Sequence, residues 1–384
     1  MFDQMTERAR TAKQPALRAV TNRIESVGGI NLSQGKCALP VHPIVKAASI
    51  RAVEEGWNTA TLRNGAEPLR AQLARRYAQE NGHSVTLDQI AVTHGVTGAL
   101  ECIFRMFLDP GDEVVLFRPA FPYYEKMLRL RGGVPVYVTL SGPDWRFDPE
   151  ALAAAFSPKT KLVVFCTPSN PTGKVFSRGE LEQVADLCRK HSVVAISDEV
   201  YQNHLADGQA HVSIASLDDM FEHAITLSSV SKTFFATGWR VGWAIGPARV
   251  MESFSVHSDQ LFLCANSIMQ YAAAYAYEDL PEEYFSTLRL PFNRRQAQLR
   301  QTLVKCGFDV ITPQGGYFVM ARYGELGFDD DDAAVDALIK QAQIGVAPGY
   351  SFEPEPGNQS GYLRFSCAIT DEEMDKACTN LQGL

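Results

Sequence analysis

The sequence lacks the cysteine spacing of a metal centre or of a disulfide-stapled fold. Its eight cysteines lie far apart, and no two of them form a Cys-x-x-Cys pair. This spacing argues against a structural zinc site and against a disulfide framework, and it is typical of proteins whose thiols stay reduced. We therefore expect no metal ion and a cytoplasmic location.

Positive charge is also in deficit. The chain has 36 Lys and Arg against 44 Asp and Glu, which gives a net charge of −8. An acidic chain has no general electrostatic attraction for phosphate backbones. We therefore do not expect nucleic acid as a partner.

Long apolar runs are missing as well. The longest uncharged stretch, residues 261–277, contains Asn266, Ser267 and Gln270 and is short for a membrane span. It favours one buried helix. The first ten residues, MFDQMTERAR, include two acids and no apolar stretch, so we expect neither a signal peptide nor a membrane partner. No repeat or low-complexity tract is present.

What is present is the pattern of a globular α/β protein. The 384 residues are 46% hydrophobic and 21% charged, a length and composition that allow two or three domains with a large core. Helices are predicted over 149–156 and 178–191, the latter entered by a capping box of Ser177 and Glu180. Between them run short Val- and Ile-rich segments, several of them apolar on both faces, as in a parallel sheet. These strand candidates are 113–117, 134–138, 161–166, 193–197, 224–227 and 241–245.

The character of the sequence changes after about residue 285. A long polar helix is predicted over 284–306, followed by a Pro-Gln-Gly-Gly turn from residue 313 and a strand over 317–322. We place a large domain at 41–285 and a small domain at 286–384. Residues 1–40 form an N-terminal arm that belongs in part to the small domain.

Four short motifs follow predicted strands, where ligands bind in open α/β sheets. They are Asn-Pro-Thr-Gly at 170–173, Asp-Glu-Val-Tyr at 198–201, Ser-Val-Ser-Lys at 229–232 and Gly-Trp-Arg at 238–240. Upstream, Gly95 and Gly98 open an apolar helix, whose N-terminus is suited to bind a phosphate. Each motif alone is weak, because turns and helix caps use the same residues.

Together, the motifs meet the needs of a single cofactor, pyridoxal 5'-phosphate. The cofactor requires a lysine amine and an acid beside its pyridine nitrogen, which Lys232 and Asp198 supply. The turn from Gly95 to Gly98, with Ser229 and Arg240, suits the phosphate. Asn170 and Tyr201 suit the phenolic oxygen of the ring.

At this point the chain resembles the class I aminotransferases of the aspartate aminotransferase fold. It is most similar to the branch of kynurenine aminotransferase, glutamine transaminase K and cysteine-S-conjugate β-lyase. The resemblance extends from Asn31 to Cys367 and is carried by residues 110–114, 166–177, 197–202, 213–217, 231–243 and 313–318. It implies a large domain with a mostly parallel seven-stranded sheet between helices, and a smaller α+β domain formed by both termini.

The same resemblance assigns roles to individual residues. It implies that Lys232 forms an aldimine with the cofactor and serves as the general base, that Asp198 keeps the ring nitrogen protonated, and that Phe121 stacks on the ring. It also implies that Arg364 binds the substrate carboxylate, for which a guanidinium fork is well shaped. The remaining assignments are a further catalytic residue, Tyr201; cofactor-binding residues Gly95, Val96, Thr97, Asn170, Ser229 and Arg240; and substrate-binding residues Gly35 and Asn170.

Three positions depart from the family pattern. Ala60 stands where the family usually has a tyrosine that reaches the phosphate across a dimer interface, so that Thr59 or Thr61 takes over the contact or it is lost. The usual Gly-x-Pro segment is replaced by residues 35–40, Gly-Lys-Cys-Ala-Leu-Pro. His94 takes the place of a small or apolar residue, and we interpret it as a satisfied histidine beneath the phosphate loop.

The sequence therefore predicts an aminotransferase that moves an amino group between an L-amino acid and a 2-oxo acid, in a homodimer with composite active sites. A second hypothesis keeps the cofactor but changes the outcome to β- or γ-elimination, replacement or cyclisation. A third, a non-catalytic sensor domain of a transcription regulator, lacks a DNA-binding segment before residue 30. The amino acid, the acceptor and the pathway stay open.

Overall fold

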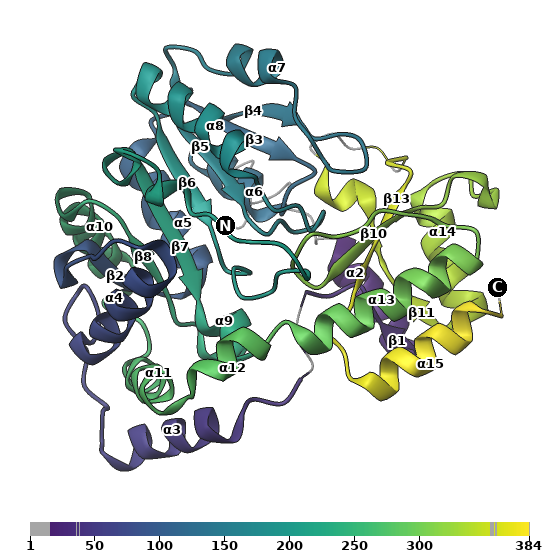
Figure 1. Cartoon of the computed structure of the whole chain (residues 1–384), viewed down its shortest axis with the longest axis horizontal. Coiled ribbons are helices and arrows are strands. Elements are labelled where there is room, and N and C mark those ends of the chain that lie inside the picture. The colour runs from purple at the N-terminus through teal and green to yellow at the C-terminus, as the bar shows by residue number, and fades with distance from the viewer. Residues whose placement is uncertain (1–15, 36, 38, 354–356, 358, 384) are drawn as a thin grey trace, which may run out of the picture.

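A computed structural model describes residues 16–35, 37, 39–353, 357 and 359–383. The part of the N-terminal arm before residue 16, together with Lys36 and Ala38 of the altered segment, lies outside the described residues. Figure 1 shows a large sheet flanked by helices on one side of the molecule. On the other side, α2 from the start of the chain lies among C-terminal elements.

The large sheet has seven strands in the order β2-β8-β7-β6-β5-β3-β4. Only β8 runs antiparallel to its neighbours, β2 and β7, so the mostly parallel seven-stranded fold is confirmed. One strand was not predicted, β2, which has only four residues and precedes the helix of the phosphate motif directly. The strands are β2 (Ile90–Thr93), β3 (Glu113–Arg118), β4 (Val134–Thr139), β5 (Thr160–Cys166), β6 (Val194–Asp198), β7 (Ala224–Ser229) and β8 (Gly242–Ile245).

Alternating residues of these strands fill two separate apolar layers. Leu162 and Val164 of β5 pack in the layer of α5 and α10, whereas Val163 and Phe165 pack in the layer of α8. Side chains of a strand point to opposite faces in turn, so both faces of the central strands are buried. The helices of the large part are α3 (Pro43–Glu54), α4 (Glu67–Asn81), α5 (Gly95–Phe107), α6 (Tyr123–Leu130), α7 (Pro149–Ala154), α8 (Arg178–His191), α9 (Val230–Thr233), α10 (Ala248–Phe262), α11 (Ser267–Asp279) and α12 (Glu282–Thr287).

The uncharged stretch 261–277 is not one helix, so that prediction was wrong. Helix α10 ends at Phe262, Leu263 has a φ of 63°, and α11 begins at Ser267. Asn266 caps α11, because its side chain accepts a hydrogen bond from the backbone N–H of Met269 at 3.1 Å. A capping residue inside an apolar run therefore marks the boundary between two helices.

The polar helix predicted over 284–306 is also divided. It consists of the end of α12 and of α13 (Leu290–Lys305), with Pro291 in the first turn of α13. Proline has no N–H to donate to the preceding turn, so it begins a helix more easily than it continues one. By contrast, α8 begins with the predicted capping box of Ser177 and Glu180.

A second group of strands and helices contains segments from both the N-terminal and the C-terminal part of the chain. Strands β12 (Ala347–Pro348), β13 (Tyr362–Ser366), β10 (Phe318–Arg322) and β9 (Asp309–Val310) form an antiparallel sheet, while β1 (Ile30–Asn31) pairs with β11 (Ile344–Gly345). Helices α2 (Ala16–Ser26), α13, α14 (Asp331–Ala337) and α15 (Asp371–Leu381) share its core, in which Ile24 and Ile30 meet Leu299 and Phe365. The boundaries at residues 40 and 285 stay a prediction.

Among the described residues, no helix has the length and hydropathy needed to cross a membrane. All eight cysteines are free.

Candidate active site

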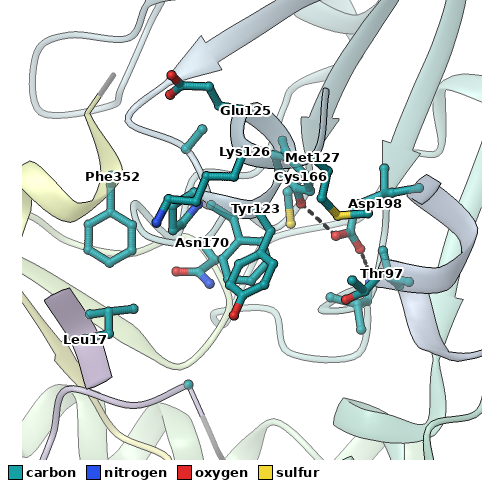
Figure 2. Close-up of a pocket in the computed structure, with 18 of the residues that line it drawn as sticks. Leu17, Thr97, Tyr123, Glu125, Lys126, Met127, Cys166, Asn170, Asp198 and Phe352 are labelled. Atoms are coloured by element: carbon teal, nitrogen blue, oxygen red, sulfur yellow. Dashed lines mark hydrogen bonds between the residues drawn. The ribbon is translucent and has the colours of Figure 1, made fainter. Parts of the chain in front are cut away.

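A cleft of about 1470 Å³ opens between the large sheet and the C-terminal elements. Figure 2 shows its wall, with Asp198 and Thr97 at one end and Phe352 and Leu17 at the other. Every candidate from the sequence except Gly95 lines this cleft: Gly35, Val96, Thr97, Phe121, Asn170, Asp198, Tyr201, Ser229, Lys232, Arg240 and Arg364. The fold thus brings together motifs that lie far apart in the sequence.

Lys232 stands on α9, directly after the end of β7. The side chain of Ser229 caps this helix by accepting a hydrogen bond from the N–H of Ser231. Nζ of Lys232 donates to the carbonyl of Gly35 at 2.8 Å and lies 5.7 Å from the ring centre of Tyr201. Burial lowers the pKa of the Lys232 amine from 10.5 to about 8, because the apolar surroundings disfavour the charged form. At pH 7 about a tenth of this amine is therefore the neutral nucleophile, far more than for a free lysine.

Asp198 ends β6 and faces the same cleft. Its Oδ2 accepts a hydrogen bond from the hydroxyl of Tyr124 at 2.7 Å, and its Oδ1 accepts one from the N–H of Val200 at 3.2 Å. Burial raises the pKa of this carboxyl to about 6, although both hydrogen bonds act in the opposite direction. Asp198 is thus a buried acid that a cationic partner in the cleft would stabilise as its carboxylate.

Arg364 on β13 lies at the other side of the cleft and is only 1% exposed. Its guanidinium donates to Oδ1 of Asn170 at 2.7 Å and to the carbonyl of Ser33 at 2.5 Å. Both acceptors are neutral, Nε has no partner among the described residues, and burial lowers the pKa of Arg364 to about 10. A buried cation without an anion is costly, so this position suits a carboxylate ligand.

The N-terminus of α5 and Arg240 form a third part of the site. Gly95 has a φ of 69°, and an added Cβ would lie 2.6 Å from Nη2 of Arg240, so glycine lets the arginine approach the helix. Arg240 donates to the carbonyls of His94 and Thr237 and has no ion pair within the described ranges. A free guanidinium beside helical N–H groups is a suitable site for a phosphate. Val96 and Thr97 belong to the first turn of this helix.

His94 and Thr61 are two of the positions at which the sequence departs from the family pattern or has to compensate for it. His94 packs against Phe262, and its buried Nδ1 has no partner in the described part of the chain, so it is not the satisfied histidine that we expected. Thr61 accepts a hydrogen bond from the side chain of Gln270 at 3.2 Å. Whether Thr59 or Thr61 takes the place of the tyrosine missing at Ala60 stays open, because that contact would be made across a dimer.

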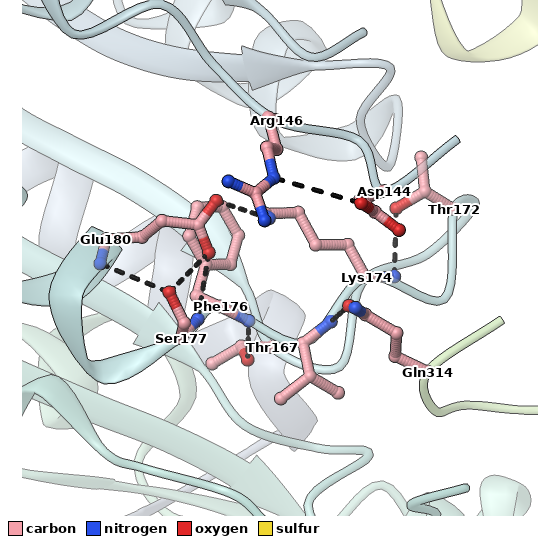
Figure 3. Close-up of polar contacts among 10 residues, drawn as sticks. Asp144, Arg146, Thr167, Thr172, Lys174, Phe176, Ser177, Glu180 and Gln314 are labelled. Atoms are coloured by element: carbon pink, nitrogen blue, oxygen red, sulfur yellow. Dashed lines mark hydrogen bonds and ion pairs between the residues drawn. The ribbon is translucent and has the colours of Figure 1, made fainter. Parts of the chain in front are cut away.

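The loop that carries Asn170 is fixed from outside the cleft (Figure 3). The buried amine of Lys174 pairs with Glu180 of the α8 capping box at 2.6 Å. The N–H of Val175 donates to Oε1 of Gln314 at 2.9 Å, and the N–H of Phe176 donates to the hydroxyl of Thr167. Asn170 is therefore held both by α8 and by the turn that follows residue 312.

Two tyrosines beside the site were given no role from the sequence. Tyr124 donates to Asp198. Tyr317 donates to the carbonyl of Gly35 at 2.8 Å, and its ring centre lies 5.6 Å from Nζ of Lys232. Tyr317 stands within the matching stretch 313–318, which was the only available signal. Tyr124 follows Phe121 by three residues, a spacing that by itself indicates packing as much as function.

Comparison with known proteins decides the family. Residues 27–381 match the model of "Aminotransferase class I and II", which is nearly the whole described chain. The chain belongs to this aminotransferase family. Its relatives include kynurenine–oxoglutarate transaminase 1 of Rattus norvegicus, 41% identical with 82% of each chain covered. The same enzyme of Mus musculus is 36% identical, with 85% of each covered.

Solved structures agree with this membership. N-succinyldiaminopimelate aminotransferase from Mycobacterium tuberculosis superposes with a TM-score of 0.93 at 28% identity, covering 98% of this chain and 99% of that one. A single mutant of Thermus thermophilus aspartate aminotransferase gives 0.90 at 30% identity, covering 98% of both chains. The protein is therefore a transaminase that depends on pyridoxal 5'-phosphate.

The residues of this aminotransferase fit that cofactor. The cleft offers a lysine amine with a lowered pKa, a buried carboxyl that forms no ion pair with another described residue, and a guanidinium beside a helix N-terminus. These groups are the chemical counterparts of an aldehyde, a protonated ring nitrogen and a phosphate. Lys232, Asp198 and Arg240 would hold the three parts of the cofactor.

Proposed function

We propose that this aminotransferase exchanges an amino group between an L-amino acid and a 2-oxo acid, with Lys232 as base and Arg364 as carboxylate anchor. The observation that carries the proposal is the buried guanidinium of Arg364, whose hydrogen-bond acceptors among the described residues are the neutral oxygens of Asn170 and Ser33. Both substrates carry the carboxylate that this cation lacks. A bidentate arginine–carboxylate pair would also orient the substrate in the cleft.

The remaining roles follow from the atoms that face the cleft. When bound, pyridoxal phosphate supplies a ring that accepts the electron pair left when the Cα–H bond of the amino acid breaks. Nζ of Lys232 would take up that proton and hold it within the cleft, a transfer helped by a pKa near 8. Asp198 stabilises positive charge on the ring nitrogen, and Tyr124 holds the carboxylate in place.

The other candidates complete the binding surfaces. Phe121, which stacks on Tyr123 at 5.0 Å between ring centres, would cover one face of the ring. Asn170 and Tyr201 would bind its phenolic oxygen, and the backbone of Gly35 would contact the substrate carboxylate. The phosphate would be bound by Gly95, Val96, Thr97, Ser229 and Arg240.

We further propose that the amino acid has a large and partly aromatic side chain. The outer wall of the cleft carries Tyr123, Tyr137 and Phe352, which offer flat apolar surfaces. Several relatives are named for kynurenine as donor and oxoglutarate as acceptor, and these are the first compounds to test. The names of these relatives give no support to elimination, replacement or cyclisation.

A homodimer in the cytoplasm completes the proposal. Large apolar side chains are exposed on α3, after Trp57 and at the turn between α10 and α11, namely Ile50, Val53, Leu62 and Leu263. Helix α11 packs against α3 and α4, so these exposed side chains belong to neighbouring elements. Such a surface suits a second copy of the chain, and eight free thiols suit a reducing compartment.

The test is to mix the purified holoenzyme with a panel of amino acids and to record the absorbance of the cofactor. We expect conversion to the pyridoxamine form with aromatic amino acids and its reversal by 2-oxo acids. Release of ammonia and a keto acid without that form would instead establish elimination. Equal rates for alanine and for aromatic amino acids would contradict the proposed substrate class.

A further inference from the structure

A second buried carboxylate, remote from Lys232, accepts more hydrogen bonds than Asp198 does. Asp331, the first residue of α14, has no exposed surface. Its Oδ1 accepts from the hydroxyl of Tyr323 at 2.7 Å and from the N–H groups of Ser360 and Gly361 at 3.0 and 3.1 Å. Its Oδ2 accepts from the N–H of Tyr350 at 2.9 Å and from the hydroxyl of Ser360 at 2.6 Å.

These donors tie together two stretches of chain that flank the cleft wall. Tyr350 belongs to the short helix η8 (Gly349–Phe352), whereas Ser360 and Gly361 precede β13. The stretches are in direct contact, because a Cβ added at Gly349 would lie 2.1 Å from Oγ of Ser360. Asp331 therefore fixes the place of η8 relative to the strand that carries Arg364.

Helix η8 in turn builds the substrate side of the cleft. The ring of Phe352 is buried, with its centre 4.7 Å from Cζ of Arg364, and it faces the open space of the cleft in Figure 2. The carbonyl of Phe352 accepts a hydrogen bond from the N–H of Ala120 at 3.0 Å. Ala120 precedes Phe121, so η8 connects the carboxylate anchor with the wall of the cofactor site.

We propose that Asp331 is a positioning residue for substrate binding, which acts by holding Phe352 against the guanidinium of Arg364. The inference rests on the proposed role of Arg364 as the carboxylate anchor. It predicts that Asp331 affects the affinity for carboxylates through Phe352, although Asp331 itself contacts neither substrate nor cofactor.

The charge of Asp331 is needed for this function. Both carboxylate oxygens face donors only, three at Oδ1 and two at Oδ2. In Asp331→Asn one side of the group becomes an NH2, which donates and cannot accept. Whichever oxygen is replaced, at least one backbone N–H loses its acceptor and faces the new N–H group: that of Tyr350 at Oδ2, or those of Ser360 and Gly361 at Oδ1. The hydroxyls of Tyr323 and Ser360 can turn to accept instead. We expect η8 to move away from its position in this variant.

A double-mutant cycle tests the proposal. The variants are Asp331→Asn, Phe352→Ala and the double variant, each as holoenzyme. One measurement is the dissociation constant of 3-phenylpropionate, a carboxylate without an amine that cannot react, followed by cofactor absorbance. The other is KM and kcat for the best amino acid of the panel. Ser360→Ala, which removes a single hydroxyl, serves as a milder variant should Asp331→Asn fold poorly.

With Phe352 present, we expect Asp331→Asn to weaken 3-phenylpropionate binding and to raise KM by about tenfold or more, equivalent to about 1.4 kcal/mol. In the Phe352→Ala background, Asp331→Asn should change the dissociation constant of 3-phenylpropionate and KM by less than about twofold, because Asp331 acts on binding through Phe352. Ser360→Ala should show a smaller effect with the same dependence on Phe352. The cofactor spectrum and affinity should not change.

Asp336→Asn is the matched control, because Asp336 lies on the same helix but pairs with Arg23 and Lys340 at the surface. It should bind 3-phenylpropionate as the wild type does. Equal losses with and without Phe352, or a lower melting temperature with unchanged binding, would overturn the proposal. Failure of every amino acid to react, while 3-phenylpropionate still binds in a manner that depends on Asp331, would refute the proposed reaction but not this inference.

Discussion

Burial favours the neutral form of the Lys232 amine, although Cys37 and Asp198 oppose this effect. A pKa of about 8 in the protein, against 10.5 for a free lysine, means that the neutral fraction reaches about one half at pH 8 and is nearly constant only above about pH 9. We predict that the apoenzyme captures pyridoxal phosphate at a rate that follows this curve. Stopped-flow absorbance between pH 6 and pH 10 measures it.

Two results check the assignment. Borohydride reduction should attach the cofactor to the peptide that contains Lys232, and label on another lysine would contradict the role of this residue. A capture rate that still rises steeply between pH 9 and pH 10 would show that burial does not lower the pKa of Lys232 as described.

Asp198 allows a charge test with little change in shape. In Asp198→Asn the amide keeps the volume but cannot balance a positive ring nitrogen. We predict a loss of half-reaction rate of about 100-fold or more, the scale of removing one preorganised electrostatic contact. Single-turnover kinetics measure the rate, and circular dichroism should show a folded protein. Turnover near that of the wild type would exclude the role given to Asp198.

A substitution of Arg364 tests substrate binding separately from the chemical step. In Arg364→Lys the charge stays but the fork that grips a carboxylate is lost. We predict an apparent KM that rises about 10- to 100-fold, the equivalent of one charge-assisted hydrogen bond, with cofactor affinity unchanged. Steady-state kinetics and cofactor titration provide the two numbers, and a change confined to kcat would argue against an anchoring role.

Among single residues, the sequence predicted those that stand in motifs shared with the family. It did not indicate residues whose roles depend on contacts with distant parts of the chain. Lys232, Asp198 and Arg364 were assigned because their neighbours match a family pattern. Tyr124 lies 74 positions from Asp198, and Asp331 lies about 30 positions from Ser360 and Gly361. Such pairs meet only after folding, and nothing in the local pattern of either partner indicates them.

At the scale of elements, α8 does more than cover the sheet. Its capping residue Glu180 also neutralises the buried amine of Lys174, whose side chain is 2% exposed. Glu180→Gln leaves that cation without an anion, so we predict a loss of about 3 kcal/mol in the free energy of unfolding, as for other broken buried pairs. Urea unfolding of the apoenzyme measures this value.

The partner variant Lys174→Met provides the control, because it leaves Glu180 with 18% of its side chain exposed to water. It should cost clearly less than Glu180→Gln. Equal losses for the two variants would mean that the loss does not come from leaving the cation of Lys174 buried without an anion.

The periodic pattern of apolar residues did not predict where some of the helices begin and end. The strands of the large sheet were predicted because apolar β-branched runs are distinctive, but the breaks between α10 and α11 and before α13 were not. Each break depends on one residue, Asn266 or Pro291, inside a segment whose overall composition still favours helix. The cleft itself could not be predicted, since its shape depends on how the two sheets face each other.

For the whole molecule, the proposed homodimer makes Ala60 informative. If the site simply forgoes the family's tyrosine contact, Ala60→Tyr should tighten cofactor binding, by up to about 3 kcal/mol for a hydrogen bond to a charged acceptor, with unchanged activity. Cofactor titration and sedimentation of wild type and variant measure this.

Loss of activity with the cofactor still bound would mean that the substrate occupies the space, as a more specialised reaction would require. A fully active monomer would remove the composite site altogether.

The pairing of β1 with β11 has a consequence for biosynthesis. Ile30 lies opposite Ile344, so β1 has no partner strand until about 310 further residues have left the ribosome. At roughly 5–20 residues per second this interval is on the order of 15–60 s. During it, the apolar side chains of α2, among them Val20 and Ile24, stay without their core. Folding during translation must therefore keep this segment soluble, and a chaperone that binds early chains would find its target there.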